Sequence, residues 1–285
     1  MRRSYAKARE EDILATCALI PPQVNRAVAG TQQAGGELAA RQGGRQRHRR
    51  PRRPDARHHR ALADEMLLFP STVRRGTPED RPYSYAFAIA VQTPGLRHIA
   101  REPLDHDRPT HDHPLFSRFE ESDCVVVFDN VYLPYGRVFA LGDAELCNGF
   151  YARTNSVHHM THQVVTRTIP RTECLLGLVP LPVEAIGIEQ FQHVQEDIAG
   201  VIVTVELLRA SLRAAEAGAE VNEYGVLTPA FAPVTAARNL CPKLYRRFPQ
   251  VLRKLGAWGL MATPTESDIN GPGRRRHRGA PPPRP

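Results

Sequence analysis

The sequence predicts an α+β fold in which a β-domain precedes a helical domain. Residues 61–145 contain short runs of β-branched and aromatic residues separated by Pro, Gly and Asp, a pattern typical of strands and turns. From residue 146 to residue 269, the apolar residues recur at helical spacing. Because strands and helices occupy separate parts of the chain, a doubly wound parallel sheet is not expected. The sequence contains neither a GxGxxG motif after a strand nor a Walker loop.

Length and composition are those of a globular protein. The chain has 285 residues, enough for two domains, and 41% of them are hydrophobic while 24% are charged. No apolar run reaches the length of a membrane-spanning helix, and the first residues lack the apolar core of a signal peptide. The five cysteines are scattered without a CxxC pair, so we expect neither a disulfide framework nor a zinc ribbon. These features predict a cytoplasmic protein with no membrane partner.

Two short arginine-rich segments carry the net charge of +8. Residues 41–60 contain nine arginines and one acidic residue, and residues 271–285 contain five arginines and no acidic residue. The rest of the chain is therefore mildly acidic, and we do not expect nucleic-acid binding from the net charge alone. Neither segment has an aliphatic residue except alanine, so neither can build a core. Two explanations stay open, namely disordered arms that bind phosphate, or GC-rich DNA translated out of frame.

These patterns divide the chain into five expected parts. They are a helical remnant (1–39), an Arg-rich irregular segment (40–60), the β-domain (61–145), the C-terminal helical domain (146–269) and a disordered basic tail (270–285). Within the first part, Pro21 and Pro22 break any helix, because proline lacks the N–H donor and restricts the residue before it.

The clearest helical pattern follows residue 190. Apolar residues at steps of three and four predict an amphipathic helix of about 30 residues, and they are Phe191, Val194, Ile198, Val201, Ile202, Val205, Leu208 and Leu212. Gly218 or residues 222–225 would end this helix. A further helix is expected over residues 236–262, interrupted by Pro242 and Pro249.

Residue types alone do not identify a reaction. His158 and His162 lie one helical turn apart in HHMTH, a spacing that can bind zinc, but the glutamate of HExxH is missing. Three more histidines in a stretch rich in Pro and Asp could add ligands, and they are His106, His111 and His113. The simpler interpretation is that these are loop and helix-surface residues, so no metal site is predicted. No cysteine has a local histidine partner and no GxSxG motif is present, so no catalytic residue is predicted.

Four longer stretches resemble a single protein family. They are TPGLRHIAREPLD (93–105), HPLFSRFEESDCVVVFDNVYLPYGRVF (113–139), GDAELCNGFYARTNSVHHMTHQVVTRT (142–168) and EAIGIEQFQHVQE (184–196). The family comprises the oxygenase components of two-component flavin-dependent phenol monooxygenases, with 4-hydroxyphenylacetate 3-hydroxylase as its namesake. The resemblance runs through residues 12–39 and 61–269. It implies an acyl-CoA dehydrogenase-like fold, with a central β-barrel domain followed by a C-terminal helical bundle that is incomplete here.

The resemblance also implies which residues bind ligands. The segment LIPPQVNR resembles the family's flavin loop, in which the matching residues line FAD, and they are Gln23, Val24, Asn25 and Arg26. Ser71 and Thr72 match positions that contact the phenolic substrate. Without the resemblance, these residues would be interpreted as an ordinary surface turn and two strand hydroxyls. Cys17 stands where the family has a histidine that touches substrate and flavin, and cysteine is the weaker hydrogen-bond donor.

The activity that the resemblance implies is hydroxylation of a phenol of the 4-hydroxyphenylacetate type, ortho to its hydroxyl group. FAD would be the cofactor, delivered as FADH2 by a separate flavin reductase, and O2 would be the co-substrate. The family resemblance further implies a homo-oligomer.

Departures from the family predict an impaired copy. Relative to the family, the chain lacks the first helical domain and the last helices, and Pro170, Pro180 and Pro182 fall where the family runs a continuous helix. The shortened bundle is expected to expose an apolar face of residues 184–212, including Phe191, Ile198 and Val205.

Two alternatives stay open. One is a non-catalytic α+β scaffold whose basic arms bind nucleic acid or acidic surfaces. The other is a dehydrogenase-like or dehydratase member of the same superfamily. The dehydratase branch needs an iron–sulfur cluster, for which these five cysteines lack a clustered ligand set.

Overall fold

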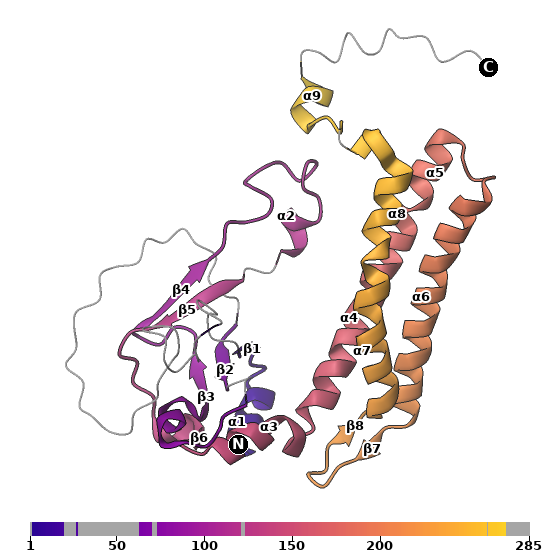
Figure 1. Cartoon of the computed structure of the whole chain (residues 1–285). Coiled ribbons are helices and arrows are strands. Elements are labelled where there is room, and N and C mark those ends of the chain that lie inside the picture. The colour runs from indigo at the N-terminus through magenta and orange to yellow at the C-terminus, as the bar shows by residue number, and fades with distance from the viewer. Residues whose placement is uncertain are drawn as a thin grey trace. The chain divides into compact units, whose positions relative to one another are not determined.

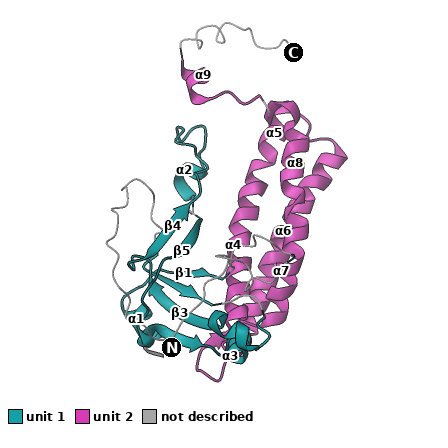
Figure 2. Ribbon diagram, turned by 60° about the vertical axis from the view of Figure 1, so that its left-hand side comes forward, with its two compact units in different colours: residues 1–150 teal, residues 151–285 magenta. Residues whose placement is uncertain are grey.

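The computed structural model describes residues 2–19, 27, 63–69, 73–120, 123–260 and 262–271. The chain forms two compact units, residues 1–150 and residues 151–285 (Figures 1 and 2). The irregular segment expected at 40–60 lies outside the described residues and stays a prediction. The same holds for most of the expected basic tail, but Asn270 is the last residue of a helix, α9 (Glu266–Asn270), and not the start of that tail.

Unit 1 is built on a four-stranded sheet with the order β1–β2–β3–β6. Its strands are β1 (Ala15–Ala18), β2 (Glu65–Leu68), β3 (Tyr85–Ala90) and β6 (Val138–Leu141). β1 pairs with β2 in parallel, whereas the other two pairs are antiparallel. A second, antiparallel sheet consists of β4 (Leu96–Ala100) and β5 (Cys124–Phe128). The helical segments of this half of the chain are α1 (Arg2–Glu10), η2 (Pro78–Tyr83), α2 (Phe116–Phe119), η3 (Tyr135–Arg137) and α3 (Ala144–Arg153).

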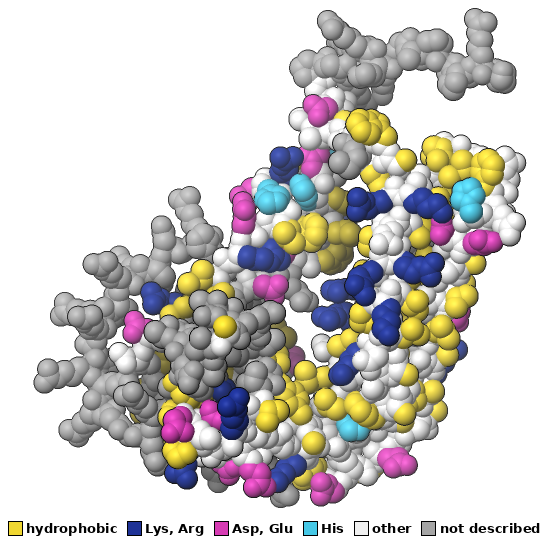
Figure 3. All heavy atoms as spheres, in the orientation of Figure 1, with side chains coloured by type: hydrophobic (Ala, Val, Ile, Leu, Met, Phe, Trp, Pro, Cys, Tyr) yellow, Lys and Arg dark blue, Asp and Glu magenta, His cyan; other side chains and the backbone are white. Residues whose placement is uncertain are grey.

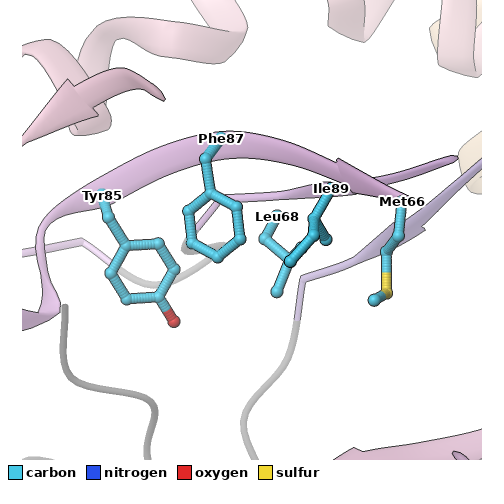
Figure 4. Close-up of a cluster of buried hydrophobic side chains, with 5 residues drawn as sticks. All are labelled: Met66, Leu68, Tyr85, Phe87 and Ile89. Atoms are coloured by element: carbon cyan, nitrogen blue, oxygen red, sulfur yellow. The ribbon is translucent and has the colours of Figure 1, made fainter. Parts of the chain in front are cut away.

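One face of the four-stranded sheet carries the main core of unit 1. Alternate residues of β2 and β3 point to this face (Figure 4), and they are Met66, Leu68, Tyr85, Phe87 and Ile89. Residues of the second sheet pack against them, with the Phe87 and Phe128 rings edge to face and their centroids 6.3 Å apart. One face of the four-stranded sheet is therefore buried against the second sheet.

The opposite face of the sheet is closed by α3. Small side chains on β3 and β6, Ala86 and Ala140, leave room for Cys147 of α3, and all three are buried together. Phe69 and Phe139 pack at the margin of this cluster. The two faces of the sheet are thus covered by different parts of the chain.

The first part of the chain differs from the helical remnant that was expected. Arg2–Glu10 is helical, but Ala15–Ala18 form strand β1 of the sheet. Asp64 secures the start of this strand, because its carboxylate accepts from the Leu14 N–H (3.0 Å) and its own N–H donates to the Leu14 carbonyl (2.8 Å). Pairing with a distant strand has therefore fixed a segment that has no strand pattern of its own.

A network of charged side chains lies at the beginning of β1 and β2. The Glu65 carboxylate accepts from Arg137 Nη1 (2.6 Å) and from Lys7 Nζ (3.2 Å), and Lys7 also pairs with Glu11. Burial by itself would raise the pKa of the Glu65 carboxyl, but the hydrogen bonds from Arg137 and Lys7 outweigh it and lower this pKa. These contacts join α1, β2 and η3 around a hollow of about 310 Å³.

Unit 2 is a bundle of helices. Its elements after α3 are α4 (Ser156–Leu178), α5 (Pro180–Ile186), α6 (Gln192–Ala217), β7 (Glu220–Val221), β8 (Leu227–Thr228), α7 (Phe231–Tyr245), α8 (Arg247–Gly256), η4 (Ala257–Leu260) and α9. Two buried clusters hold the bundle together. One joins α4, α6 and α7 around Val165, Leu208 and Val234, and the other joins α6 and α8 around Val194 and Val251.

Three prolines of unit 2 occupy two settings, the interior of a helix and its first turn. Pro170 lies inside α4. Pro180 begins α5, where the missing N–H would have no helical partner, so the proline costs little there. Pro242 lies inside α7, and the helix expected at 236–262 is divided at Arg246 between α7 and α8.

Helix α6 lies where the helical spacing of apolar residues predicted it, but the prediction of which residues it exposes is partly wrong. It runs from Gln192 to Ala217 and ends at Gly218, one of the two ends that were predicted. Phe191 is exposed as expected, but Val205 is buried and Ile198 packs against the second buried cluster. The expectation that Ile198 and Val205 form an exposed apolar face is therefore wrong, because both belong to the inner face of α6.

No helix in the described ranges is both long enough and apolar enough to cross a membrane.

We expect Glu65→Gln to lower the free energy of unfolding at neutral pH by about 1–2 kcal/mol, because the hydrogen bonds from Arg137 and Lys7 lose their charged acceptor. A carboxyl whose folded pKa is lowered stabilises the fold above its unfolded pKa, and this stability is lost as the pH falls through the folded value. The difference in the free energy of unfolding between wild type and E65Q should therefore become smaller as the pH falls below 4.5, the ordinary pKa of this carboxyl. Denaturant titrations over acid pH measure it. Glu10→Gln, at an exposed position on α1, is the control. A constant difference at every pH would contradict the role given to Glu65.

Candidate functional site

The parallel pairing of β1 and β2 defines one edge of the sheet in unit 1. Ala18 and Leu68, the last residues of the two strands, are partners in the register although they are 50 positions apart. Because parallel strands end at the same edge, the chain leaves both strands side by side. Gln23–Arg26 follow β1 by a few residues, and Ser71 and Thr72 follow β2. All six lie outside the described residues, so their predicted contacts stay a prediction.

Cys17 is the last residue but one of β1, so it lies close to the point where the chain leaves the sheet. It pairs with Leu67 in the register and is exposed, with a free thiol. Its neighbour Ala18 packs against the core cluster around Phe87, so Cys17 points to the opposite face of the sheet, which it shares with Leu67. Cys17 therefore takes no part in the main core.

Helix α3 holds the chain on both sides of the segment that contains Ser71 and Thr72. Before this segment, the Phe69 ring packs on the Phe150 ring with a centroid distance of 4.8 Å. After it, the Arg74 N–H donates to Asn148 Oδ1 (2.8 Å), and Asn148 Nδ2 donates to the Arg74 carbonyl (2.9 Å). One amide side chain thus satisfies both backbone groups of a residue in a loop. The geometry fixes where this loop leaves and rejoins the sheet.

Cys147, also on α3, is a packing residue. It is buried among Ala86 and Ala140. Burial raises the pKa of its thiol, the charge of Asp143 raises it further, and Arg74 opposes both. A buried thiol that stays protonated is not a nucleophile.

The structure brings together one cysteine–histidine pair that local sequence reasoning missed. Cys124 Sγ lies 3.8 Å from His98 Nδ1 across the sheet of β4 and β5. His98 Nε2 lies 2.9 Å from the Val91 carbonyl, which can only accept, so Nε2 carries the proton and Nδ1 accepts from the thiol. Burial, followed by the charge of Asp123, raises the pKa of the Cys124 thiol. This pair is therefore a neutral hydrogen bond and not an activated nucleophile.

The histidines of HHMTH have separate partners in unit 2. The His158 ring packs on Phe231 with a centroid distance of 4.5 Å, and His162 Nε2 lies 3.1 Å from Glu216 Oε1. Burial, and then the neighbouring His158 and His162, lower the pKa of His159. Among the described residues, no group of three or more His, Cys, Asp or Glu is placed to hold a metal ion.

The loop histidines that sequence analysis considered as further ligands also have local contacts. His106 lies 3.5 Å from Glu102 and His111 lies 3.5 Å from Asp112. His113 faces the ring of His106, with a centroid distance of 6.1 Å. These contacts join residues of one loop to each other.

Comparison with known proteins places both units in one family. The model of the 4-hydroxyphenylacetate 3-hydroxylase N-terminal domain matches residues 58–140, and that of the C-terminal domain matches residues 147–276. The oxygenase component of 4-hydroxyphenylacetate 3-monooxygenase from Geobacillus is 43% identical over 93% of this chain and 54% of its own length. The Thermus thermophilus protein of the same name is 42% identical over 95% of this chain and 56% of its own length. The chain thus spans about half the length of the curated relatives it matches.

Solved structures give the same result. The crystal structure of an oxygenase component of 4-hydroxyphenylacetate 3-monooxygenase with FAD and 4-hydroxyphenylacetate superposes with a TM-score of 0.82 at 38% identity. The superposition covers 96% of this chain and 58% of that one. An archaeal 4-hydroxybutyryl-CoA dehydratase shares the fold, with a TM-score of 0.78 at 12% identity. The α+β fold class predicted from the sequence is confirmed, and the chain has the fold of the oxygenase component.

We expect Asn148→Ala to lower the free energy of unfolding by about 1–3 kcal/mol, because it leaves the Arg74 N–H and carbonyl without their side-chain partner. Asn148→Asp keeps the acceptor and loses the donor, so it should cost less. Asn239→Ala is the matched control, since that amide donates only to a carbonyl of its own exposed helix turn. Thermal and denaturant unfolding measure the three variants. Equal losses for N148A and N239A would show that α3 does not secure this loop.

Proposed function

The chain belongs to the 4-hydroxyphenylacetate 3-hydroxylase family, and from this premise we propose that it acts as an oxygenase component of a two-component flavin-dependent monooxygenase, in impaired form. The substrate would be a phenol of the 4-hydroxyphenylacetate type. The identity of 43% over 93% of the chain with such a component carries this proposal. Family membership is shown, but the reaction is a proposal because the chain spans about half the length of each such relative.

The proposed reaction adds one oxygen atom to the ring, ortho to the hydroxyl group. FADH2 supplies two electrons and activates O2, one oxygen atom enters the phenol, and the other leaves as water. Gln23, Val24, Asn25 and Arg26 would line the flavin, because side-chain amides, backbone N–H groups and a guanidinium suit its carbonyl edge and phosphates. Ser71 and Thr72 would hold the phenol by hydrogen bonds.

The parallel strands support this assignment of residues. The two predicted segments are far apart in the sequence, yet each follows one of two adjacent strands that end at the same edge. Phe69 and Arg74, held by α3, limit where Ser71 and Thr72 can lie. A site of this kind needs fixed supports, because small displacements of positioning groups reduce the rate strongly.

Cys17 is the main reason to propose impaired activity. The thiol is a weak hydrogen-bond donor at a position where the family has an imidazole. Its exposed place in β1, on the face away from the main core, makes it available for contact with a ligand at this edge. A wet or loosely held site would let reduced flavin react with O2 without hydroxylating the phenol.

The remaining partners are part of the same proposal. A separate flavin reductase, a homo-oligomeric assembly and a cytoplasmic location stay predictions from the sequence. The alternative of basic arms that bind nucleic acid or acidic surfaces rests on residues 41–60 and 271–285, nearly all of which lie outside the described residues.

We expect the 285-residue chain, supplied with photoreduced FAD, O2 and 4-hydroxyphenylacetate, to give no stoichiometric catechol. Cys17→His restores an imidazole donor and should raise the catechol yield about tenfold or more, which corresponds to one hydrogen bond to a charged group. Cys174→His, at an exposed cysteine of α4, is the matched control. Product analysis and peroxide assays measure both outcomes. Stoichiometric catechol from the unchanged chain would show that the activity is intact, and equal yields for C17H and C174H would remove Cys17 from the site.

A further inference from the structure

Cys124 and His98 lie on the inner side of the sheet formed by β4 and β5 (Figure 1). His98 is the register partner of Val126, and Val126 packs against the core cluster around Phe87, so the two side chains point to the side that faces the core. Cys124 precedes Val126 by two residues and therefore points to the same side. Both residues are partly buried. The pair thus lies at the margin of the core, where side chains are held in place but remain accessible to solvent.

The distance between the two side chains fits the coordination of one metal ion. Cys124 Sγ and His98 Nδ1 are 3.8 Å apart. Zinc binds a thiolate sulfur at about 2.3 Å and an imidazole nitrogen at about 2.0–2.1 Å. Two ligand atoms at these distances, with a tetrahedral angle at the ion, are about 3.5–3.6 Å apart. A small rotation of the Cys124 side chain covers this difference, so the two strands need not move.

His98 has the second contact that a ligating histidine requires. Its Nε2 lies 2.9 Å from the carbonyl oxygen of Val91, the residue after β3, and Nε2 therefore carries the ring proton. A histidine that binds a metal almost always donates its other ring N–H to a carbonyl or carboxylate, which fixes the tautomer and the orientation of the ring. The lone pair of Nδ1 is thus directed toward the sulfur of Cys124.

Other histidines are arranged differently. Figure 3 shows histidine side chains in separate places on this face of the molecule. Among them or elsewhere on the chain, His162 faces the Glu216 carboxylate, and His106 and His111 face carboxylates of their own loop. The Cys124–His98 pair offers a sulfur together with a nitrogen, and this combination suits zinc-like ions better than an imidazole beside a carboxylate.

We propose that Cys124 and His98 bind one thiophilic divalent ion, Zn²⁺ or Cd²⁺, which links β4 to β5. The thiol releases its proton as the bond between Sγ and the metal forms, while Nδ1 supplies its lone pair. Among the described residues, no third His, Cys, Asp or Glu is placed to join the two ligands, so water completes the coordination. We therefore expect weaker binding than at a closed site with four protein ligands.

The first test measures Cd²⁺ binding through the ultraviolet charge-transfer band of a cadmium thiolate, which histidine alone does not produce. It uses the full chain without flavin, so the result is independent of the proposed enzymatic activity. A parent variant in which Cys17 and Cys174 are serine lacks the two exposed thiols. This parent should bind one Cd²⁺ and show the band, and Cys124→Ser should abolish it. Cys241→Ser is the matched control, because Cys241 is also a partly buried free thiol, and it should keep the band.

The second test addresses the histidine ligand. His98→Gln in the same parent should raise the Kd for Cd²⁺ by about tenfold or more, because one of two protein ligands is lost. His111→Gln, at an exposed loop position, is the control and should leave this Kd unchanged. Circular dichroism establishes that each variant is folded, and Cys124→Ala provides a second replacement of the thiol.

Thermal unfolding gives a separate measurement. Zn²⁺ should raise the midpoint of the parent and not that of C124S, because an ion that binds the folded chain stabilises it. A band of equal strength in the parent and C124S, loss of the band in C241S, or an unchanged Kd in H98Q would overturn the proposal. Equal stabilisation of the parent and C124S by Zn²⁺ would overturn it as well.

Discussion

The parallel pairing of β1 with β2 is the interaction on which the arrangement of unit 1 depends. It joins two segments that are 50 residues apart in the register and makes a short stretch near the N-terminus part of the sheet. β1 is only four residues long and mostly exposed, so its own side chains contribute little to burial. Asp64 fixes the beginning of the pairing, because its carboxylate accepts from the Leu14 N–H and its own N–H donates to the Leu14 carbonyl. Without this pairing, the two segments predicted to bind flavin and phenol would have no common edge.

The two ends of the strand pair are stabilised by different forces. At the beginning, the Glu65 carboxylate forms ion pairs with Lys7 of α1 and with Arg137 of η3. At the end, contacts with α3 replace charges: the Phe69 ring packs on Phe150, and the Asn148 amide binds the backbone of Arg74. The ion pairs at the beginning weaken in acid and in salt, whereas the ring packing and the amide hydrogen bonds at the end involve no ionised group.

Periodic elements were predictable from the sequence, and contacts between distant residues were not. The runs around Met66, Phe87 and Val126 became β2, β3 and β5, and the helix after residue 190 ended at Gly218, because runs of β-branched and aromatic residues and helical spacing are local properties. β1 was missed, since its sequence ATCA is not a run of β-branched and aromatic residues and only the partner strand makes it extended. The pair of Asn148 with Arg74 was missed for a related reason, since the two residues are 74 positions apart. The sequence did not distinguish the buried face of α6 from its exposed face, because apolar residues lie around most of the helix.

A stable fold and a working flavin site place different demands on this chain. Each unit has buried clusters of its own, around Phe87 in unit 1 and around Val165 and Val194 in unit 2, and these clusters stabilise the fold. Cys17 is exposed and faces away from the cluster around Phe87, so exchanging an imidazole for a thiol there removes no buried contact. The proposed chemistry, in contrast, depends on the hydrogen bond that such a side chain can donate. A substitution at this position can therefore weaken catalysis while leaving the fold of the family intact.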